Sequence, residues 1–392
     1  MKSLVKKYGA PLYVYEARVI KDRYQKLAKN LNHPRLRIHY AVKANSNLEI
    51  LRYLRKLGAG AETVSLGEVL ISLKAGFKPK DIIYTCSNIT KEELETLNKR
   101  KIRVNLDSLN QIKMWGELAP GTSISFRVNQ GIGAGNHHHF ITGGPESKFG
   151  IDVRQINKAL ALAKKYKLTV NGIQQHIGSG ILNENKKIFI EAMMALLHTA
   201  RRFPDLEFID FGGGIGIPYR PNEKPLDLNR LGRSVVKILK EFEAVYGRKL
   251  NFVFEPGRYL IAEAGTLLVT VTDIKINPSK VFIGVNSGFN HLIRPAMYDS
   301  YHEIVNLSRQ GGKKIKASIV GNICESADFF AKDRPIPLPK IGDALAILNA
   351  GAYGFSMSSN YNLRPRPAEV LIEANRARLI RRREKVETII KN

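Results

Sequence analysis

The sequence predicts an α/β fold in which a (β/α)8 barrel of the TIM type is joined to a C-terminal all-β domain, a β-sandwich or β-barrel. From about residue 36 to 258, short apolar runs alternate with helical patterns, which is typical of parallel strands joined by helices. Eight such runs favour a closed barrel over an open, doubly wound sheet. After residue 258 the segments are rich in β-branched residues and are separated by Gly, Pro and Asn, which predicts a second, all-β domain.

The elements can be placed in order along the chain. Barrel strands are expected at 37–42, 61–64, 82–85, 102–105, 123–129, 169–177, 207–211 and 251–255. The helices expected between them include 48–57, 67–74, 91–99, 154–165, 186–202 and 228–246. Strands of the β-domain are expected at 267–276, 280–285, 316–320, 344–348 and 368–373. The proline-rich segments 333–339 and 360–367 are expected to be loops, because proline lacks the N–H that a sheet needs.

Composition narrows the class of protein. A chain of 392 residues suits two domains, and 44% hydrophobic with 25% charged residues is typical of a folded, soluble protein. Its two cysteines, Cys86 and Cys324, are too few for a disulfide scaffold or a thiolate zinc site. The first residues lack the apolar core of a signal peptide, and no run approaches the ~20 apolar residues of a membrane span. We therefore expect a cytoplasmic protein that does not bind membranes.

The formal net charge of +27 is unusual. It would suit a nucleic-acid partner if the basic residues were clustered, but they are spread along the chain. The one dense run, 376–385, has the pattern of a strand leading into an amphipathic helix. No zinc-finger, basic-zipper or aromatic RNA-binding pattern is present, so we expect no nucleic-acid partner, although a nucleic-acid binder stays an alternative.

Residues at the carboxyl ends of barrel strands are the candidates for chemistry. Lys43 follows the first strand; it is either a solvated strand end or a partly desolvated amine suited to imine formation. Glycine-rich turns follow the sixth and seventh strands, at 176–180 and 210–216, and Glu255-Pro-Gly-Arg258 follows the eighth. Glycine turns expose backbone N–H groups to phosphate oxygens, and barrels commonly bind phosphate beyond the last two strands.

Together these residues describe a site for pyridoxal phosphate. Lys43 would form the imine, the turns would hold the phosphate, and Glu255 would keep the pyridine nitrogen protonated. The fingerprints of nucleotide sites are absent. Residues 137–139 are three consecutive histidines, but neighbouring side chains cannot converge on one ion, so we expect no metal.

The motifs also carry a family resemblance that extends over nearly the whole chain. The sequence resembles the fold-type III pyridoxal-phosphate decarboxylases, and within them the members that act on diaminopimelate. The matching stretches are YAVKANSN (40–47), SLGE (65–68), TGGPESKFGI (142–151), HIGSG (176–180), FGGGIGIPY (211–219), EPGR (255–258), LIRPAMYDSYHEI (292–304), GNICESADFFAKDR (321–334) and GAYGFSMSSNYNLRPRPAEVLI (351–372).

The resemblance implies a division of the chain into a cofactor-binding barrel, 32–260, and a β-domain formed by 261–392 with 1–31. It also implies a homodimer with shared active sites, in which the partner subunit supplies the proton donor Cys324 together with Glu325. The residues implied to bind the cofactor are Lys43, His176, Ser179, Gly213, Gly214, Glu255, Gly257, Arg258 and Tyr353, and those implied to bind substrate are Arg258, Arg294, Tyr298, Glu325 and Tyr353. Lys43, His176, Glu255 and Cys324 are the implied catalytic set.

The activity implied is decarboxylation of meso-2,6-diaminopimelate to L-lysine, the last step of lysine biosynthesis. Gly180, Glu62 and the stretch RVNQ (127–130) depart from the usual family pattern without removing a group that the mechanism requires. An ornithine-, arginine- or carboxynorspermidine-type decarboxylase remains an alternative, as does a non-catalytic cofactor-binding homologue. The pairing of Arg294 with Glu325 favours a substrate that carries a distal carboxylate and a distal amine.

Overall fold

The computed structural model describes residues 1–135, 142–309, 311 and 313–391. They form two compact units. The barrel unit comprises Arg23–Ile217 and Lys224–Tyr259, and the β-unit comprises Met1–Asp22, Pro218–Glu223 and Leu260–Asn392.

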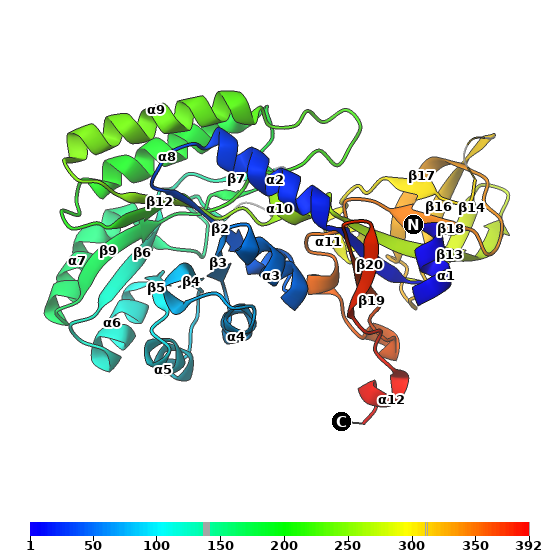
Figure 1. Cartoon of the computed structure of the whole chain (residues 1–392), viewed down its shortest axis with the longest axis horizontal. Helices are drawn as coiled ribbons and strands as arrows, with labels where there is room; N and C mark the ends of the chain where they lie inside the picture. The colour runs from blue at the N-terminus through cyan, green and yellow to red at the C-terminus, as the bar shows by residue number, and fades with distance from the viewer. Residues whose placement is uncertain (136–141, 310, 312, 392) are drawn as a thin grey trace. The chain divides into compact units, whose positions relative to one another are not determined.

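Eight parallel strands close into a ring in the barrel unit (Figure 1). Their order is β2-β3-β4-β5-β6-β9-β11-β12, and β12 pairs with β2 to complete the barrel. The strands are β2 (Leu36–Ala41), β3 (Gly60–Thr63), β4 (Ile82–Thr85), β5 (Arg103–Leu106), β6 (Ser123–Asn129), β9 (Thr169–Gln174), β11 (Phe208–Asp210) and β12 (Asn251–Phe254). The predicted (β/α)8 barrel is confirmed.

Helices follow the first seven barrel strands and lie outside the ring (Figure 1). They are α3 (Leu48–Lys56), α4 (Leu66–Lys74), α5 (Lys91–Lys99), α6 (Leu109–Leu118), α7 (Ile156–Lys165), α8 (Lys186–Ala200) and α9 (Leu228–Tyr246). Side-chain caps determine where several helices begin. Thr90 and Glu93 form a reciprocal capping box at the start of α5, and Ser65 caps the start of α4. Another helix, α2 (Ala17–Asn30), precedes the barrel, and its end packs so closely on α9 that a Cβ at Gly232 would lie 2.1 Å from the Asn30 carbonyl oxygen.

The sixth barrel strand is shorter than predicted. β9 ends at Gln174 rather than at Ile177, and the backbone N–H of Gln175 makes the last ladder bond, to the carbonyl oxygen of Asp210 on β11. Residues Gly178–Ser179 form a separate two-residue strand, β10, that pairs with β7 (Ala134–Gly135), and β8 (Ile151–Asp152) extends the edge of β6. The chain therefore turns at His176 before it reaches the glycine-rich segment.

The β-unit contains a nine-stranded mixed sheet around β13 (Gly265–Ile276). Its main path is β17-β16-β14-β13-β1-β19-β20; off this path, β18 pairs with β13 and β15 pairs with β18. The remaining strands are β1 (Leu12–Glu16), β14 (Val281–Val285), β15 (Ile304–Asn306), β16 (Lys314–Val320), β17 (Phe329–Pro337), β18 (Ala344–Ile347), β19 (Ala368–Glu373) and β20 (Arg376–Arg381). Short helices α1 (Lys2–Tyr8), α10 (Arg258–Ile261), α11 (Arg294–Tyr298) and α12 (Val386–Ile389) accompany them.

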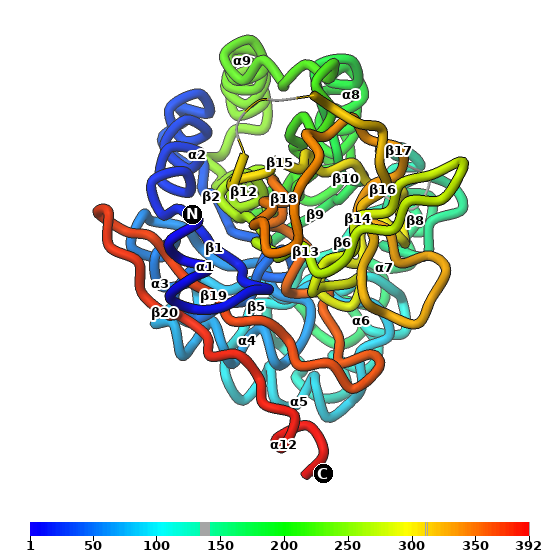
Figure 2. The backbone as a smooth tube through the Cα atoms, turned by 90° about the vertical axis from the view of Figure 1, so that its right-hand side faces the viewer, coloured from blue at the N-terminus to red at the C-terminus, as the bar shows by residue number. Residues whose placement is uncertain are grey.

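β1 was not predicted as a strand. It lies between β13 and β19, antiparallel to the first and parallel to the second (Figure 2). Its Leu12 and Val14 are fully buried, together with Leu268 and Val370 from the neighbouring strands. The start of the chain thus supplies part of the core of the β-unit.

The prediction that 333–339 is a loop is wrong, because β17 continues to Pro337. β17 is the last strand on its side of the sheet and pairs only with β16. Proline is tolerated in such an edge strand where its nitrogen points away from the pairing strand, because no hydrogen bond of the sheet is then lost. The basic run at 376–385 forms β20 as expected, although the helix after it has only four residues. Within the described ranges, no helix is both long and apolar enough to cross a membrane.

Candidate active site

Lys43 lies at the carboxyl end of the first barrel strand, in the one-turn 3-10 helix η1 (Val42–Ala44). Its Nζ atom lies 2.5 Å from Oε2 of Glu62, which is buried at the end of the adjacent β3. The side chain of Lys43 is one-third exposed, whereas that of Glu62 is 2% exposed. The amine is therefore held by a buried carboxylate but is open on one side.

Glu255 follows β12 and is buried in the barrel. Its Oε2 atom accepts a hydrogen bond of 3.1 Å from Nε2 of Gln174, while Oε1 has no donor among the described side chains. Burial raises the pKa of Glu255 well above its usual range, and the neighbouring carboxylate of Asp210 raises it further. A cationic partner at the orphaned oxygen would compensate this buried group.

Asp210 at the end of β11 is the second member of this carboxyl pair. It is fully buried, and burial raises its pKa to about 7, while the hydrogen bond that it accepts from the backbone of Gly212 acts in the opposite direction. The backbone N–H of Gly212 donates to Oδ1 of Asp210 at 2.8 Å. The two neighbouring carboxylates repel each other when both are ionised, so the pKa of Glu255 is raised by Asp210 in addition to burial.

His176 is held as a neutral ring. The backbone N–H of Gly213 donates to its Nδ1 atom at 3.0 Å, which requires Nδ1 to be unprotonated. Burial lowers the pKa of His176 well below its usual value, and the nearby cations of Lys43 and Arg127 lower it further. The imidazole is thus fixed in orientation and in tautomer.

The two glycine-rich turns leave no room for side chains. Gly214 has a φ of +115°, and a Cβ there would lie 2.9 Å from the carbonyl oxygen of Gly178. A Cβ at Gly213 would lie 2.3 Å from the carbonyl oxygen of Glu255. A Cβ at Gly257, in the turn after the last barrel strand, would lie 3.0 Å from the Cβ atom of Ala44. Beside these turns, Nε of buried Arg258 donates to Oγ of Ser179 at 3.1 Å.

These groups fit pyridoxal phosphate. The orphaned Oε1 of buried Glu255 suits a protonated ring nitrogen, the amine of Lys43 suits the aldehyde, and the turns with Arg258 and Ser179 offer donors for a phosphate. The structure brings Lys43, His176, Ser179, Gly213, Gly214, Glu255, Gly257 and Arg258 into the barrel unit at the ends of its strands. The remaining predicted residues lie in the β-unit.

Arg294 begins α11 in the β-unit and is 2% exposed. Its guanidinium carbon lies 4.6 Å from the centre of the Tyr219 ring, and Nη1 lies 3.1 Å from Nε2 of His302. Nδ1 of His302 donates to the carbonyl oxygen of Leu348 at 2.8 Å, so Nε2 carries the lone pair that accepts from Arg294. The orientation of this guanidinium is fixed by its surroundings. Tyr298, also predicted to bind substrate, ends the same helix.

Cys324 and Glu325 lie on a turn between β16 and β17. The N–H of exposed Cys324 donates to Oδ1 of Asn362 at 2.9 Å, and the hydroxyl of Tyr361 donates to Glu325 at 2.6 Å. The ring of Tyr361 in turn stacks on Phe289, with 5.8 Å between the ring centres. The segment around residue 361 therefore positions both predicted residues.

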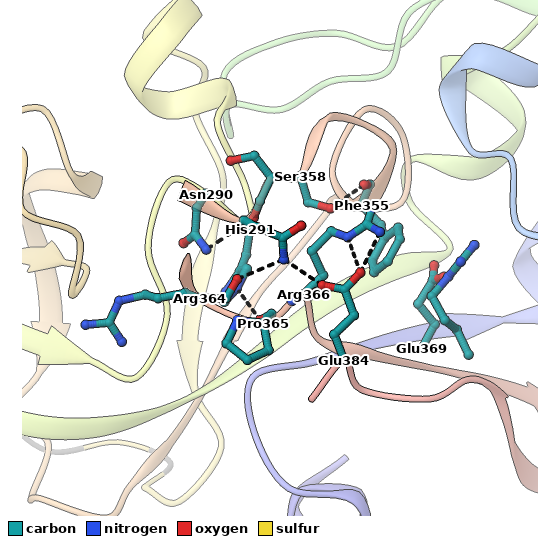
Figure 3. Close-up of polar contacts among 12 residues, drawn as sticks. Asn290, His291, Phe355, Ser358, Arg364, Pro365, Arg366, Glu369 and Glu384 are labelled. Carbon is teal, nitrogen blue, oxygen red and sulfur yellow. Dashed lines mark hydrogen bonds and ion pairs between the residues drawn. The ribbon is translucent and has the colours of Figure 1, made fainter. Parts of the chain in front are cut away.

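Glu384, near the C-terminus, forms hydrogen bonds with both ends of the segment 360–366, which contains Tyr361 and Asn362 (Figure 3). Nδ2 of Asn360 and Nε of Arg366 each donate to the Glu384 carboxylate at 2.6 Å, and the backbone N–H of Arg366 donates at 2.9 Å. Burial acts against ionisation, but these hydrogen bonds prevail and lower the pKa of Glu384 to about 2. A further predicted residue, Tyr353, has a φ of +57°, which is uncommon for an aromatic residue and typical of functional segments.

Sequence reasoning missed three contacts of the barrel site: it named Asp210 and Glu62 without pairing them with Glu255 and Lys43, and it did not identify Gln174 as the donor to Glu255. Each lies at or near a strand end, so its polar side chain in an apolar strand was the available signal. The histidines at 137–139, for which no metal was expected, lie outside the described residues. Elsewhere in the described chain, no three His, Cys, Asp or Glu side chains gather as a metal site.

Comparisons with known proteins agree with this geometry. Residues 17–262 match the family described as pyridoxal-dependent decarboxylase, pyridoxal binding domain. The chain is 43% identical to the diaminopimelate decarboxylase of Methanothermobacter thermautotrophicus over 99% of its own length and 92% of that protein. It is 40% identical to the diaminopimelate decarboxylase of Aquifex aeolicus, covering 100% and 93%. The crystal structure of diaminopimelate decarboxylase from Helicobacter pylori complexed with L-lysine superposes with a TM-score of 0.91 at 34% identity, covering 99% and 98%.

Proposed function

Because the chain belongs to the family of pyridoxal-dependent decarboxylases, we propose that it converts meso-2,6-diaminopimelate to L-lysine and carbon dioxide. The family match confirms the cofactor and the enzyme class that the sequence predicts. The observation that carries the activity is the placement of the Lys43 amine and the buried Glu255–Asp210 pair at the strand ends of one barrel. The substrate is supported by the relatives, which match over almost their entire length.

The barrel residues would hold the cofactor in a fixed orientation. Lys43 would bind it covalently through Nζ, and Glu255 would pair with its ring nitrogen through the oxygen that has no other donor. Ser179, Arg258 and the backbone of Gly213, Gly214 and Gly257 would bind its phosphate. Bound pyridoxal phosphate supplies a conjugated ring that accepts the electrons left behind when carbon dioxide departs.

His176 would keep the ring in place without contributing charge. Its neutral state follows from the hydrogen bond that Nδ1 accepts from Gly213. A neutral imidazole can lie against an aromatic ring without placing a second cation beside the protonated ring nitrogen. We assign His176 a positioning role for this reason.

The substrate's distal end carries one carboxylate and one ammonium group, and the β-unit offers a complement to each. Arg294 presents a fixed fork suited to a carboxylate, and Glu325 suits the ammonium. Arg258, Tyr298 and Tyr353 would complete the substrate site. We assign Cys324 the return of a proton to the substrate carbon, with Cys324 and Glu325 supplied by the partner subunit of a homodimer.

We infer that the enzyme acts in the cytoplasm, because its two cysteines, Cys86 and Cys324, are free thiols and Cys324 is exposed, which suits a reducing compartment.

Carbon dioxide release from a panel of amino acids tests the function. The purified holoenzyme should turn over meso-diaminopimelate with a kcat/KM far above those for lysine, ornithine and arginine. Lys43→Ala protein serves as the control for contaminating activity. A comparable or higher kcat/KM for ornithine or arginine would replace the proposed substrate, and no release from any of the four would contradict decarboxylation.

A further inference from the structure

A cationic cavity lies at the opposite end of the barrel from Lys43, where the parallel strands begin. Its volume is about 570 Å³, which is within the range of small-molecule sites. Arg37 near the start of β2, Arg103 at the start of β5 and Asn251 at the start of β12 line it. None of the residues assigned to the cofactor takes part in it.

The charges around this cavity are unbalanced. Five cationic side chains line it, and the only carboxylates beside them are Asp81 and Glu207. Oε2 of Glu207 accepts a hydrogen bond from Asn171 at 3.1 Å instead of pairing with a lining cation. Among the described side chains no carboxylate lies within ion-pair distance of the five, which are Arg37, Arg55, Arg103, Lys78 and Lys80.

The three arginines are held in place by uncharged partners, which are backbone carbonyl oxygens and an aromatic ring. Nε of Arg55 donates to the carbonyl oxygen of Ala75 at 3.0 Å, and Nη1 of Arg37 donates to that of Leu36 at 3.1 Å. The guanidinium carbon of Arg103 lies 4.6 Å from the centre of the Phe208 ring. Burial lowers the pKa of Arg103, and the carboxylates of Glu207, Asp210 and Asp81 offset this only in part. A partly desolvated guanidinium with no carboxylate in contact favours an anion in the adjacent space.

We propose that this cavity binds a small polyanion, a molecule that carries two or more phosphate or carboxylate groups. Arg103 and Arg37 would bind one anionic group at the strand starts, and Lys78 with Lys80 would bind the other from the one-turn 3-10 helix η2 (Pro79–Asp81) and its N-cap, just before β4. Two arginine forks suit oxyanions better than a halide, because each presents paired N–H donors. The site is separate from the decarboxylation chemistry, and its existence does not depend on the proposed substrate.

Pyrophosphate is a suitable probe, titrated calorimetrically into holoenzyme whose cofactor already fills the phosphate site of the barrel. The variant is Lys78→Gln with Lys80→Gln; both side chains are exposed, so the fold should be preserved. The matched control is Lys158→Gln with Lys164→Gln, which removes the same charge from the exposed surface of α7. We expect saturable binding to the parent, weakened roughly tenfold or more in the variant and unchanged in the control.

The arms of the experiment separate the alternatives. Citrate binding as tightly as pyrophosphate would identify a polycarboxylate site, and binding of pyrophosphate alone would identify a phosphate site. No saturable binding to the parent, an equal loss in the variant and the control, or release of the cofactor's colour during the titration would overturn the proposal. Without pyrophosphate the variant should decarboxylate diaminopimelate at the parent rate, which keeps this test distinct from that of the activity.

Discussion

Nζ of Lys43 and Oε2 of Glu62 lie 2.5 Å apart at the ends of adjacent strands β2 and β3. Glu62 is almost completely buried, so its charge depends on this amine for compensation. The relationship gives Lys43 a structural role in addition to the covalent one assigned to it.

Lys43→Ala should therefore lose covalent cofactor attachment and also destabilise the cofactor-free protein. We expect a loss of about 1–3 kcal/mol, below the range for fully buried pairs because the lysine is one-third exposed. Adding Glu62→Gln to this variant should restore most of the stability, since no unpaired charge remains. Borohydride reduction followed by peptide mass analysis measures attachment, and urea denaturation measures stability. Pyridoxyl label at another lysine of the parent would refute the assignment.

The Asp210–Glu255 pair predicts how the cofactor-free protein responds to pH. Both pKa values are raised in the folded state, that of Asp210 to about 7, so the folded protein holds protons that the unfolded chain releases near pH 4. The contribution of this pair to the free energy of unfolding is therefore complete below about pH 4. It decreases as the pH rises from there through 7, because the unfolded chain has already released these protons. The slope should reach about 1.4 kcal/mol per pH unit for each proton retained.

Asp210→Asn should flatten this slope, because the amide cannot ionise but can still accept from Gly212. Denaturant unfolding of the cofactor-free proteins between pH 5.5 and 8.5 provides the measurement. Glu184→Gln, at an exposed position, is the control and should keep the parent slope. Parent and Asp210→Asn profiles that coincide would show that the pKa of Asp210 is not raised in the folded protein.

Strands could be predicted from the sequence where an apolar run packs against elements close to it in the chain. Prediction was poorer where a strand pairs with segments far away in the sequence. The barrel strands appear close to their predicted positions because each run is buried between its own neighbours. β1 was missed although Leu12 and Val14 are fully buried, since its partners β13 and β19 lie more than two hundred residues away. β17 was missed because Pro335 and Pro337 disfavour a central strand but not an edge strand.

The same distinction applies to the site. Lys43 and Glu255 follow apolar strands and could be identified one at a time. The proximity of Asp210 to Glu255 depends instead on the register of two strands, in which Asp210 is opposite Val253 and Glu255 follows two residues later. Register is set by packing of the whole barrel, so a single local pattern does not contain it.

Glu384 predicts a second, opposite pH dependence. Its pKa is lowered to about 2 in the folded state, so its hydrogen bonds with Arg366 and Asn360 stabilise the protein above the unfolded pKa near 4.5. This contribution is lost as pH falls from about 4.5 towards 2. Glu384→Gln should cost about 1 kcal/mol at neutral pH, because the carboxylate is a quarter exposed and is partly screened.

The Glu384 contacts also hold the segment that carries Tyr361 and Asn362, so Glu384→Gln should increase amide hydrogen exchange at 359–366. Glu387→Gln, an exposed acidic residue three positions later, is the matched control and should change neither stability nor exchange. Unaltered exchange in Glu384→Gln would show that the segment is held by other contacts.

The proposed shared site predicts complementation between inactive subunits. A hybrid dimer of Lys43→Ala and Cys324→Ala subunits would contain one site with both residues intact and one site with neither. Random exchange should then restore about a quarter of the parent activity. Native mass spectrometry would verify exchange. Exchanged but inactive hybrids would show that each site uses Cys324 of its own chain.

Arg294 predicts the preference for a substrate with a distal carboxylate. Tyr219 and His302 orient its guanidinium, so the fork is prepared to bind both oxygens of a carboxylate at once. Arg294→Lys keeps the charge and most of the volume but loses the fork. A substrate carboxylate left without its arginine typically loses about 2–5 kcal/mol, which corresponds to roughly a thirtyfold to several-thousandfold loss in kcat/KM.

We expect Arg294→Lys to fall towards the lower end of this range for diaminopimelate while its cofactor absorbance stays that of the parent. Lysine, which lacks the distal carboxylate, should be a poor substrate for the parent because the arginine would stay unpaired, and its kcat/KM should change little in the variant. The decisive quantity is thus the ratio of kcat/KM for diaminopimelate over lysine, which should fall on substitution. A ratio that is unchanged in Arg294→Lys would remove this arginine from substrate recognition and leave Arg258 as the candidate for the distal carboxylate.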